Sequence, residues 1–326
     1  MSDAELGGKG GTIGGSIVAQ ILGVSPYGGQ HDAWVRIVKG RDIPDNEAME
    51  RGRRLEPWVA EVAAETLGVR IEPPFKTTSR FNGEFRLSYS IDFEAYDKTG
   101  KPCAIVEIKT SGDRRRWPEG GHPEHRLQVQ HYLAGRDLDV GYIVGVQASA
   151  EVFRFIHSPE ALRYALENGC ARLHVETVKR DPRYTKEVIP FLLDWFETFV
   201  TTKTPPPADG SSGCTEALRV HFQGRDGETE ATEEIESLAR QYDEIKASIK
   251  ESTRAKAEAE NKLRELLGRH KSAESEAVRV TISEQPGRLR FDAKRFKEEH
   301  PELHQRYMVK GGGFDQLRIK LKQAEG

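Results

Sequence analysis

The sequence has little of several features that would assign a class at once. Its 326 residues include only three cysteines, widely separated, which is typical of a reducing compartment and argues against a disulfide framework or a structural zinc site. Its apolar runs are far shorter than the roughly 20 residues of a membrane-spanning helix, so we expect no membrane contact. Its first residues have neither a basic start nor an apolar core segment, so we expect no secretory signal and a cytoplasmic location.

The chain also has almost no net charge. It contains 49 Lys and Arg against 52 Asp and Glu, a balance of −3, so the overall charge gives no sign of a nucleic-acid partner and its distribution matters more. One basic run stands out, namely Arg114, Arg115 and Arg116. Such a loop is either solvated surface or a guide for a polyanion, and we give the two interpretations equal weight.

Two acids and a lysine on two predicted strands are the most informative feature. Asp92 lies on one apparent strand, and Glu107-Ile108-Lys109 ends the next one. Because alternate residues of a strand share a face, Glu107 and Lys109 point to one side while Ile108 enters the core. If the two strands pair, the three polar side chains meet around one point. Metal-assisted phosphodiester hydrolysis uses these groups, since the acids hold a divalent cation and the lysine positions or helps to deprotonate the attacking water.

The apolar periodicity predicts helices followed by a mixed sheet with one crossing helix, which is an α/β core. Pro57 lies inside the third helix, where its missing amide should bend or split that helix. The predicted helices are 16–22, 32–39, 46–67, 124–135 and 185–200, and the predicted strands are 69–72, 75–81, 85–95, 103–110, 141–147 and 151–157.

Three further polar residues lie on predicted helices. Glu56, just before Pro57, is either a solvated helix residue or a third acid turned toward the cation. Gln128 and Tyr132 are four positions apart and therefore share a helix face. That pair is either ordinary polar surface or a support for a phosphate or for the lysine.

The composition changes sharply after residue 200, where 201–214 is rich in Thr, Pro, Gly and Ser. We predict a core at 1–200, a linker at 201–230, a coiled-coil helix at 231–270 and a small basic module at 275–326. In the coiled-coil segment, Ser252 and Lys256 weaken the middle of the seam, and the periodicity does not specify whether the partner helix belongs to this chain or another. The a positions are Ile235, Tyr242, Ile249, Lys256 and Leu263, and the d positions are Leu238, Ile245, Ser252, Ala259 and Leu266.

The C-terminal tail is modestly basic. Residues 277–326 contain eleven Lys and Arg against seven Asp and Glu. Arg318, Lys320 and Lys322 alternate, so they would share one face of a strand at 316–321. The tail is either soluble surface or a DNA contact, and we favour the DNA contact.

Four segments follow one another along the chain: Gly14 to Tyr27, Arg51 to Pro57, Asp92 with Glu107-Ile108-Lys109, and Gln128 to Leu133. In this order they resemble the YqaJ-like viral recombinase family, relatives of lambda exonuclease in the PD-(D/E)xK nuclease superfamily. One alone is a weak signal, whereas together they are specific and extend over about residues 12–200. The family usually has a proline before its catalytic aspartate, where this chain has Ile91; that departure bears on the shape of the strand more than on Asp92.

The resemblance implies a restriction-endonuclease-like core with a mixed central sheet flanked by helices, followed by the long helix and a small basic α+β tail. It implies a phage or prophage DNA exonuclease that uses Mg²⁺, with Mn²⁺ as an alternative. Such enzymes digest double-stranded DNA ends from 5′ to 3′ and leave a 3′ strand for a single-strand annealing protein. The best-known relative is a ring trimer. A structure- or sequence-specific endonuclease and a non-catalytic DNA-end-binding adaptor are the alternatives.

The same resemblance implies a role for each candidate residue. Asp92, Glu107 and the carbonyl of Ile108 would bind the cation, with Glu56 completing the ligands directly or through water. Lys109 would orient the water. The supporting and DNA-binding residues would be Gln128 and Tyr132 beside the lysine or the phosphate, Arg51, Arg53 and Arg54 on a DNA phosphate, Ser16 on the DNA backbone, and Arg114 to Arg116 along the approach path.

Overall fold

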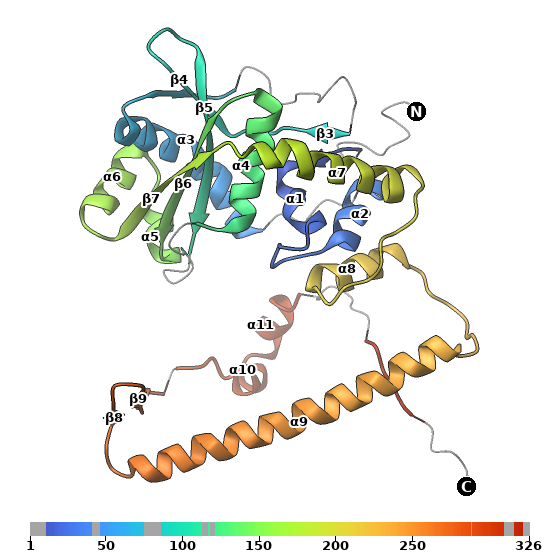
Figure 1. Ribbon diagram of the computed structural model, residues 1–326. Coiled ribbons are helices and arrows are strands. Elements are labelled where there is room, and N and C mark those ends of the chain that lie inside the picture. The colour runs from blue at the N-terminus through green and yellow to red at the C-terminus, as the bar shows by residue number, and fades with distance from the viewer. Residues whose placement is uncertain are drawn as a thin grey trace. The chain divides into compact units, whose positions relative to one another are not determined.

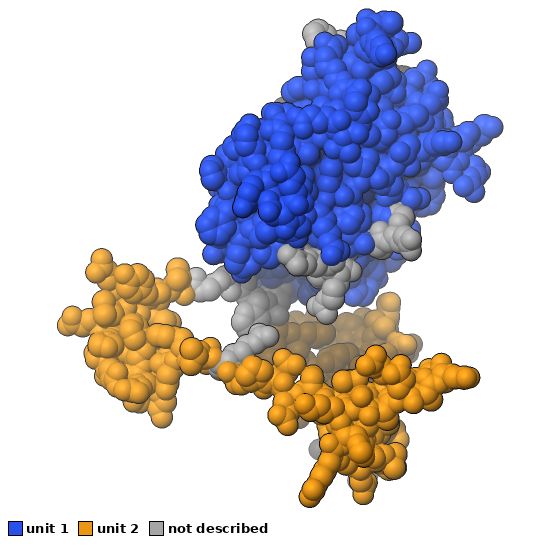
Figure 2. All heavy atoms as spheres, turned by 90° about the vertical axis from the view of Figure 1, so that its left-hand side faces the viewer, with its two compact units in different colours: residues 1–225 blue, residues 226–326 orange. Residues whose placement is uncertain are grey.

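The computed structural model describes residues 11–40, 46–74, 86–112, 117, 121–287, 289–309 and 316–321. The chain divides into two compact units, residues 1–225 and residues 226–326, which Figure 2 colours separately. Within the described ranges, none of the helices has both the length and the apolar character that crossing a membrane requires. The prediction of a strand at 75–81 lies outside the described residues.

A five-stranded mixed sheet is the centre of the first unit (Figure 1). The neighbouring strands β5 (Pro102–Ser111) and β6 (Val140–Ala148) are parallel, and every other neighbouring pair of this sheet is antiparallel. A parallel pair needs a crossover connection, which α4 (Pro123–Arg136) provides. The predicted α/β class with a mixed central sheet is therefore confirmed. The strand order is β2 (Arg70–Glu72), β4 (Phe93–Tyr96), β5 (Pro102–Ser111), β6 (Val140–Ala148) and β7 (Ala171–Lys179).

Helices cover both faces of this sheet, and the alternation along β5 assigns each residue to a face. Ile105 belongs to the core on the α4 side, whereas Val106 and Ile108 belong to the opposite core. Glu107 and Lys109 therefore share the α4 side with Ile105. On the α4 side lie α1 (Gly15–Ile21), α2 (Gln30–Val38) and the helical segment of η2 (Tyr184–Val188), α7 (Ile189–Trp195) and η3 (Phe196–Thr201); on the other lie α3 (Glu47–Leu67), α5 (Ala150–Phe155) and α6 (Pro159–Glu167).

The helix α3 carries several candidate residues, and its ends are well defined. The Asn46 side chain accepts hydrogen bonds from the amides of Ala48 and Met49 at 3.0 Å each, which caps the N-terminus. The C-terminus ends at Gly68, whose φ of 66° suits glycine. The helix is not split at Pro57, because packing of its apolar face against the sheet holds both halves in place.

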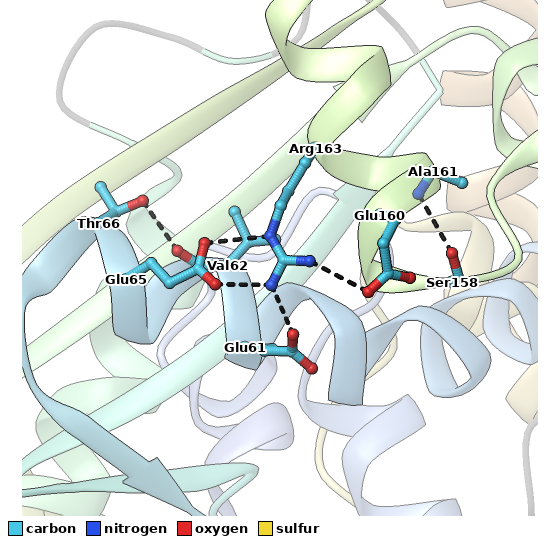
Figure 3. Close-up of polar contacts among 8 residues, drawn as sticks. All are labelled: Glu61, Val62, Glu65, Thr66, Ser158, Glu160, Ala161 and Arg163. Atoms are coloured by element: carbon cyan, nitrogen blue, oxygen red, sulfur yellow. Dashed lines mark hydrogen bonds and ion pairs between the residues drawn. The ribbon is translucent and has the colours of Figure 1, made fainter.

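Arg163 of α6 fixes the position of α3 from the outside (Figure 3). Its guanidinium reaches Glu61 at 2.5 Å and Glu65 at 2.6 Å on α3, and Glu160 at 3.4 Å on its own helix. The hydrogen bond from Arg163 lowers the pKa of Glu65. Single exposed ion pairs contribute little, but this shared cation joins two helices through one network.

Two strand predictions in the first unit need correction. The predicted strand at 85–95 is two short strands, β3 (Leu87–Ser88), which pairs in parallel with β1 (Ile13–Gly14), and β4. Asp92 lies in the bend between them rather than on a strand. The strand at 151–157 is wrong, because residues 150–155 form α5, whose first turn is capped by the Ser149 hydroxyl.

The segment predicted as a linker, 201–230, contains a helix, α8 (Ser212–His221). Cys214 and Ala217 of this helix are fully buried, and α8 packs against α2. Nearby, one ring nitrogen of His31 lies 2.9 Å from the carbonyl oxygen of Pro206. Residues up to 225 thus belong to the first compact unit.

The second unit contains one long helix and a few short elements. The long helix α9 (Glu233–Leu267) has 35 residues and lies within the segment 231–270 that was predicted as a coiled-coil helix. The predicted strand at 316–321 is wrong, because these described residues form no regular secondary structure. The short elements are β8 (Ser272–Glu274) and β9 (Arg279–Thr281), which pair antiparallel, and the helices α10 (Ala293–Glu299) and α11 (Pro301–Arg306).

Candidate functional site

Asp92 is held against the middle of β5. Phe93 pairs with Val106 across the antiparallel β4–β5 ladder, which brings the preceding residue level with Glu107. There the Asp92 carboxylate oxygen Oδ2 accepts a hydrogen bond of 2.9 Å from the amide of Ile108. This bond fixes the carboxylate beside the segment that carries Glu107 and Lys109.

Glu107 and Lys109 form an ion pair on the α4 side of the sheet. Glu107 is fully buried, and the Lys109 ammonium donates a hydrogen bond to its oxygen Oε1. The second oxygen, Oε2, is buried and has no hydrogen-bond partner among the described residues. The structure therefore brings Asp92, Glu107 and Lys109 together, and it leaves one buried carboxylate oxygen free to bind a ligand.

The pKa values of this cluster are strongly perturbed. Burial raises the pKa of Glu107 to about 8, with Lys109 acting in the opposite direction. Burial also raises the pKa of Asp92, which Lys109 and the Ile108 amide partly offset. For Lys109, burial works to lower the pKa, but the charges of Glu107 and Asp92 outweigh it and raise the pKa. Ionisation of Glu107 and Asp92 therefore costs free energy in this buried site, and a bound cation would reduce that cost.

Glu56 on α3 is close enough to take part in the same electrostatics. Burial is the largest cause of the raised pKa of Glu56, and the charge of Asp92 raises this pKa further. The charges of Lys109 and Arg53 act in the opposite direction. The third acid is thus half-buried at the edge of the cluster rather than on a solvated helix face.

Gln128 and Tyr132 are buried on α4 and contact each other. The Gln128 amide donates a 3.0 Å hydrogen bond to the Tyr132 hydroxyl. Burial raises the pKa of Tyr132, and the charge of Glu107 adds to that shift. Gly15 on α1 packs on the tyrosine, since a Cβ there would lie 2.7 Å from the ring. The neighbouring Ser16 is exposed.

The ring of Trp117 forms a wall beside Lys109 that the sequence alone did not indicate. Lys109 pairs with Gly145, and Gly145 pairs with His174, so the three lie in one row across the sheet. The Trp117 indole occupies the space above Gly145, where a Cβ would meet it at 2.1 Å, and it stacks on His174 with ring centroids 5.0 Å apart. The sequence signal for this contact was Gly145 inside an apolar strand, because such a glycine often marks a place where another part of the chain closely approaches the backbone.

Two imidazoles extend this wall. The His122 ring meets Trp117 edge-on, with centroids 5.7 Å apart, and lies 5.2 Å from the His125 ring. Burial lowers the pKa of His125 to about 3, and the charge of Lys109 contributes. His125 is therefore neutral at pH 7 and adds no positive charge beside the lysine.

Two arginines of α3, Arg51 and Arg54, contact Phe153 of α5, whereas Arg53 lies near Glu56. Arg54 donates a 3.1 Å hydrogen bond to the carbonyl of Phe153, and the Arg51 guanidinium lies 4.9 Å from the centroid of the Phe153 ring. Arg51 Nε is buried and has no hydrogen-bond partner among the described residues. Arg114, Arg115 and Arg116 lie outside the described residues. A cavity of about 160 Å³ is lined by Glu47, Glu50, Arg51, Arg54, Ala150, Phe153 and Arg154.

The donor set of the acid cluster suits a hard divalent cation. Among the described residues, no group of three or more His, Cys, Asp or Glu side chains is arranged to hold a metal ion. Two carboxylates are present, however, and the partnerless Oε2 of Glu107 is an available oxygen ligand. Mg²⁺ is commonly bound by one or two carboxylates, with water and substrate oxygens completing its shell. The residues therefore fit such an ion without a full protein cage.

Residues 6–137 match the family model of the YqaJ-like viral recombinase domain. The chain is also similar to the crystal structure of an alkaline exonuclease, LHK-Exo, from Laribacter hongkongensis, with 15% identity, 61% of this chain and 91% of that chain covered, and a TM-score of 0.40. A phage related exonuclease from Haemophilus somnus 129PT gives 15% identity, coverage of 59% and 96%, and a TM-score of 0.41. No curated protein matches the sequence.

The matched segment contains the cluster residues Asp92, Glu107 and Lys109 and the neighbouring Glu56. It also contains Ser16, Gln128 and Tyr132. It ends one residue after α4, and thus includes the strands and helices that position these side chains. The resemblance predicted from the four sequence segments is confirmed over this range. Residues 6–137 of the chain are therefore similar to a YqaJ-like viral recombinase domain.

Proposed function

We propose that the chain is a metal-dependent DNA exonuclease that degrades the ends of linear double-stranded DNA, from 5′ to 3′, in phage-type homologous recombination. The observation that carries the proposal is the convergence of Asp92, Glu107 and Lys109, with a partnerless buried oxygen on Glu107. The family match over the same residues supports it independently of the geometry.

Asp92 and Glu107 would hold the cation, with the Ile108 carbonyl and Glu56 as further oxygen ligands. When bound, Mg²⁺ or Mn²⁺ would stabilise negative charge on the phosphate and promote ionisation of the attacking water. Glu107 faces the site from a fully buried position, so its carboxylate cannot rotate freely. A fixed ligand of this kind lowers the reorganisation that the reaction requires.

Lys109 acts as a cation in this proposal rather than as a base. Its pKa is raised by Glu107 and Asp92, so its side chain keeps its proton at neutral pH. The ammonium then orients the attacking water and stabilises the charge that develops on the phosphate. Gln128 and Tyr132 support this side of the site, and Trp117 keeps bulk water away from the lysine.

The DNA path uses positive groups outside the acid cluster. Arg51 and Arg54 line the cavity beside α5, and Arg53 lies near Glu56, so all three could hold phosphates, one of them the 5′ end. Ser16 is exposed at the start of α1 and would contact the DNA backbone. Arg114 to Arg116 would guide the duplex toward the acids. A single-strand annealing protein would receive the 3′ strand, and a ring trimer would keep the enzyme on its DNA.

Digestion of end-labelled duplexes tests the activity and its polarity together. Linear DNA labelled at either the 5′ or the 3′ end is incubated with Mg²⁺ or with a chelator, and closed circular DNA is the control substrate. We expect early release of the 5′ label, no cutting of the circle and no hydrolysis with chelator. Cutting of the circle would indicate the endonuclease, and tight DNA binding without hydrolysis would indicate the adaptor.

Site variants test the residue assignments. Asp92→Asn, Glu107→Gln and Lys109→Met should each lower kcat at least 100-fold while circular dichroism shows a retained fold. Lys101→Met is the matched control, because Lys101 is exposed on the turn before β5. Wild-type activity of Lys109→Met would refute the role given to the lysine.

A further inference from the structure

The second unit has almost no hydrophobic core of its own. Among its described residues, Leu267 is the only buried hydrophobic side chain. A unit of residues 226–326 needs substantial apolar burial to offset the loss of conformational entropy on folding. It must therefore gain that burial from a partner surface.

The exposed apolar side chains of α9 form one narrow stripe. They occupy a and d positions of the heptad, and the stripe is as narrow as the seam of a coiled coil rather than the broader face of a helix on a globular core. The exposed fractions are Ile235 50%, Leu238 58%, Tyr242 48%, Ile245 52%, Ile249 61%, Leu263 44% and Leu266 83%.

We propose that α9 pairs with α9 of a second copy of this chain in an antiparallel, fully overlapping coiled coil. The proposal is independent of the nuclease activity. It rests on three properties of α9, namely the sizes of the seam residues, the position of its one charged seam residue and the charge difference between its two halves.

The seam residues complement each other in size in the antiparallel arrangement. There each a residue packs against a d residue of the partner, and full overlap of the 35-residue helix sets the register. The small residues Ala259 and Ser252 then face large ones, and large residues meet at both ends, which fills the seam evenly. The layers are Ile235 with the partner's Leu266, Leu238 with the partner's Leu263, Tyr242 with the partner's Ala259, Ile245 with the partner's Lys256, and Ile249 with the partner's Ser252.

A parallel pair would be less favourable at the same positions. Each residue would face its own copy, so Lys256 would meet the partner's Lys256 in the middle of the seam. Ser252 and Ala259 would each form a layer of two small side chains, which leaves voids. In the antiparallel pair, the aliphatic stem of Lys256 packs on Ile245 and its ammonium reaches solvent.

The two halves of α9 also carry opposite charge. Residues 233–249 contain five acidic and two basic residues, a net charge of −3, and residues 250–267 contain four acidic and five basic residues, a net charge of +1. An antiparallel pair places each acidic half beside a basic half, whereas a parallel pair places the two acidic halves together. The helix macrodipoles favour the same orientation.

Disulfide trapping in the full-length chain distinguishes the arrangements. The exposed Cys103 and Cys170 are first replaced by serine. Leu238→Cys with Leu263→Cys should then form an intermolecular disulfide under mild oxidation. Leu238→Cys alone should not, because in the antiparallel pair its two copies lie about 37 Å apart along the helix. Ala247→Cys with Arg254→Cys, at outward-facing f positions, is the matched control and should remain uncross-linked.

Light scattering supplies the second measurement. The native chain of 36.6 kDa should assemble, and Ile245→Asp with Ile249→Asp should halve the measured mass without unfolding the first unit. Three results would overturn the proposal. The first is a monomeric native chain, which would place a segment of the same chain on the stripe. The others are an unchanged mass in the double variant and a disulfide formed by Leu238→Cys alone. None of these readouts depends on DNA hydrolysis, so they are separate from the test of the proposed function.

Discussion

Ionisation of His131 should limit the stability of the first unit in mild acid. His131 is fully buried on α4, where one ring nitrogen lies 3.1 Å from the Ser88 carbonyl oxygen and the other 3.1 Å from the Tyr184 hydroxyl. Its ring stacks on Tyr89 with centroids 4.7 Å apart. The residue thus joins α4, which carries Gln128 and Tyr132, to the segment that leads into Asp92.

The magnitude follows from the pKa shift. Burial lowers the pKa of His131 from 6.5 to about 4, with carbonyl contacts acting in the opposite direction. The unfolded chain therefore binds a proton at His131 more tightly than the folded chain does. The contribution to stability is fully present above pH 6.5 and is lost as the pH falls through about 4. A shift of this size corresponds to about 3 kcal/mol in the free energy of unfolding.

Urea unfolding of the wild type and of His131→Phe, at pH 7, 6, 5 and 4, tests this expectation. Phenylalanine keeps the stacking on Tyr89 but leaves Ser88 and Tyr184 without this partner, which should cost about 1–3 kcal/mol at pH 7. Between pH 6.5 and 4 the wild type should lose about 3 kcal/mol more than the variant. The difference between the two proteins should therefore vanish or change sign near pH 4.

Comparison with the variant removes the contributions of other groups, because these groups titrate in both proteins. His125, whose pKa is also lowered by burial, is one of these groups. His157→Phe, at an exposed position, controls for the loss of any histidine. If the stability difference between the wild type and His131→Phe stays constant from pH 7 to pH 4, the reasoning about His131 is refuted.

Two further substitutions probe the surroundings of the acid cluster. Gly145→Ala adds a methyl group 2.1 Å from the Trp117 ring, so it should displace the indole and lower kcat at least tenfold. The control is Gly112→Ala, whose methyl group meets no described atom within 4 Å and which should therefore keep the wild-type rate. Equal rates for both variants would contradict the role given to the Trp117 ring. Arg136→Met should lower the free energy of unfolding by about 3–5 kcal/mol, because the fully buried Glu94 carboxylate loses its ion pair. Adding Glu94→Gln to that variant should restore most of the loss, and a double variant as unstable as Arg136→Met would count against a buried charge as the cause.

Short-range patterns in the sequence determined much of this protein. The alternation along residues 103–110 was enough to predict that Glu107 and Lys109 share a face, because side-chain direction along a strand has a period of two. The heptad from Ile235 to Leu266 was enough to predict one long helix, because that repeat matches a single helical stripe. The α/β class followed from the order of such segments.

Only the tertiary structure decided the long-range contacts. Pairing of β4 with β5 set Asp92 against the Ile108 amide, and the register of β5, β6 and β7 put Gly145 beneath Trp117 and next to Lys109. Strand register depends on contacts between residues far apart in the chain, which local periodicity does not encode. The helix at 150–155 was missed for a related reason, since the Ser149 cap and burial of Phe153 select a helix in a segment that was predicted as a strand.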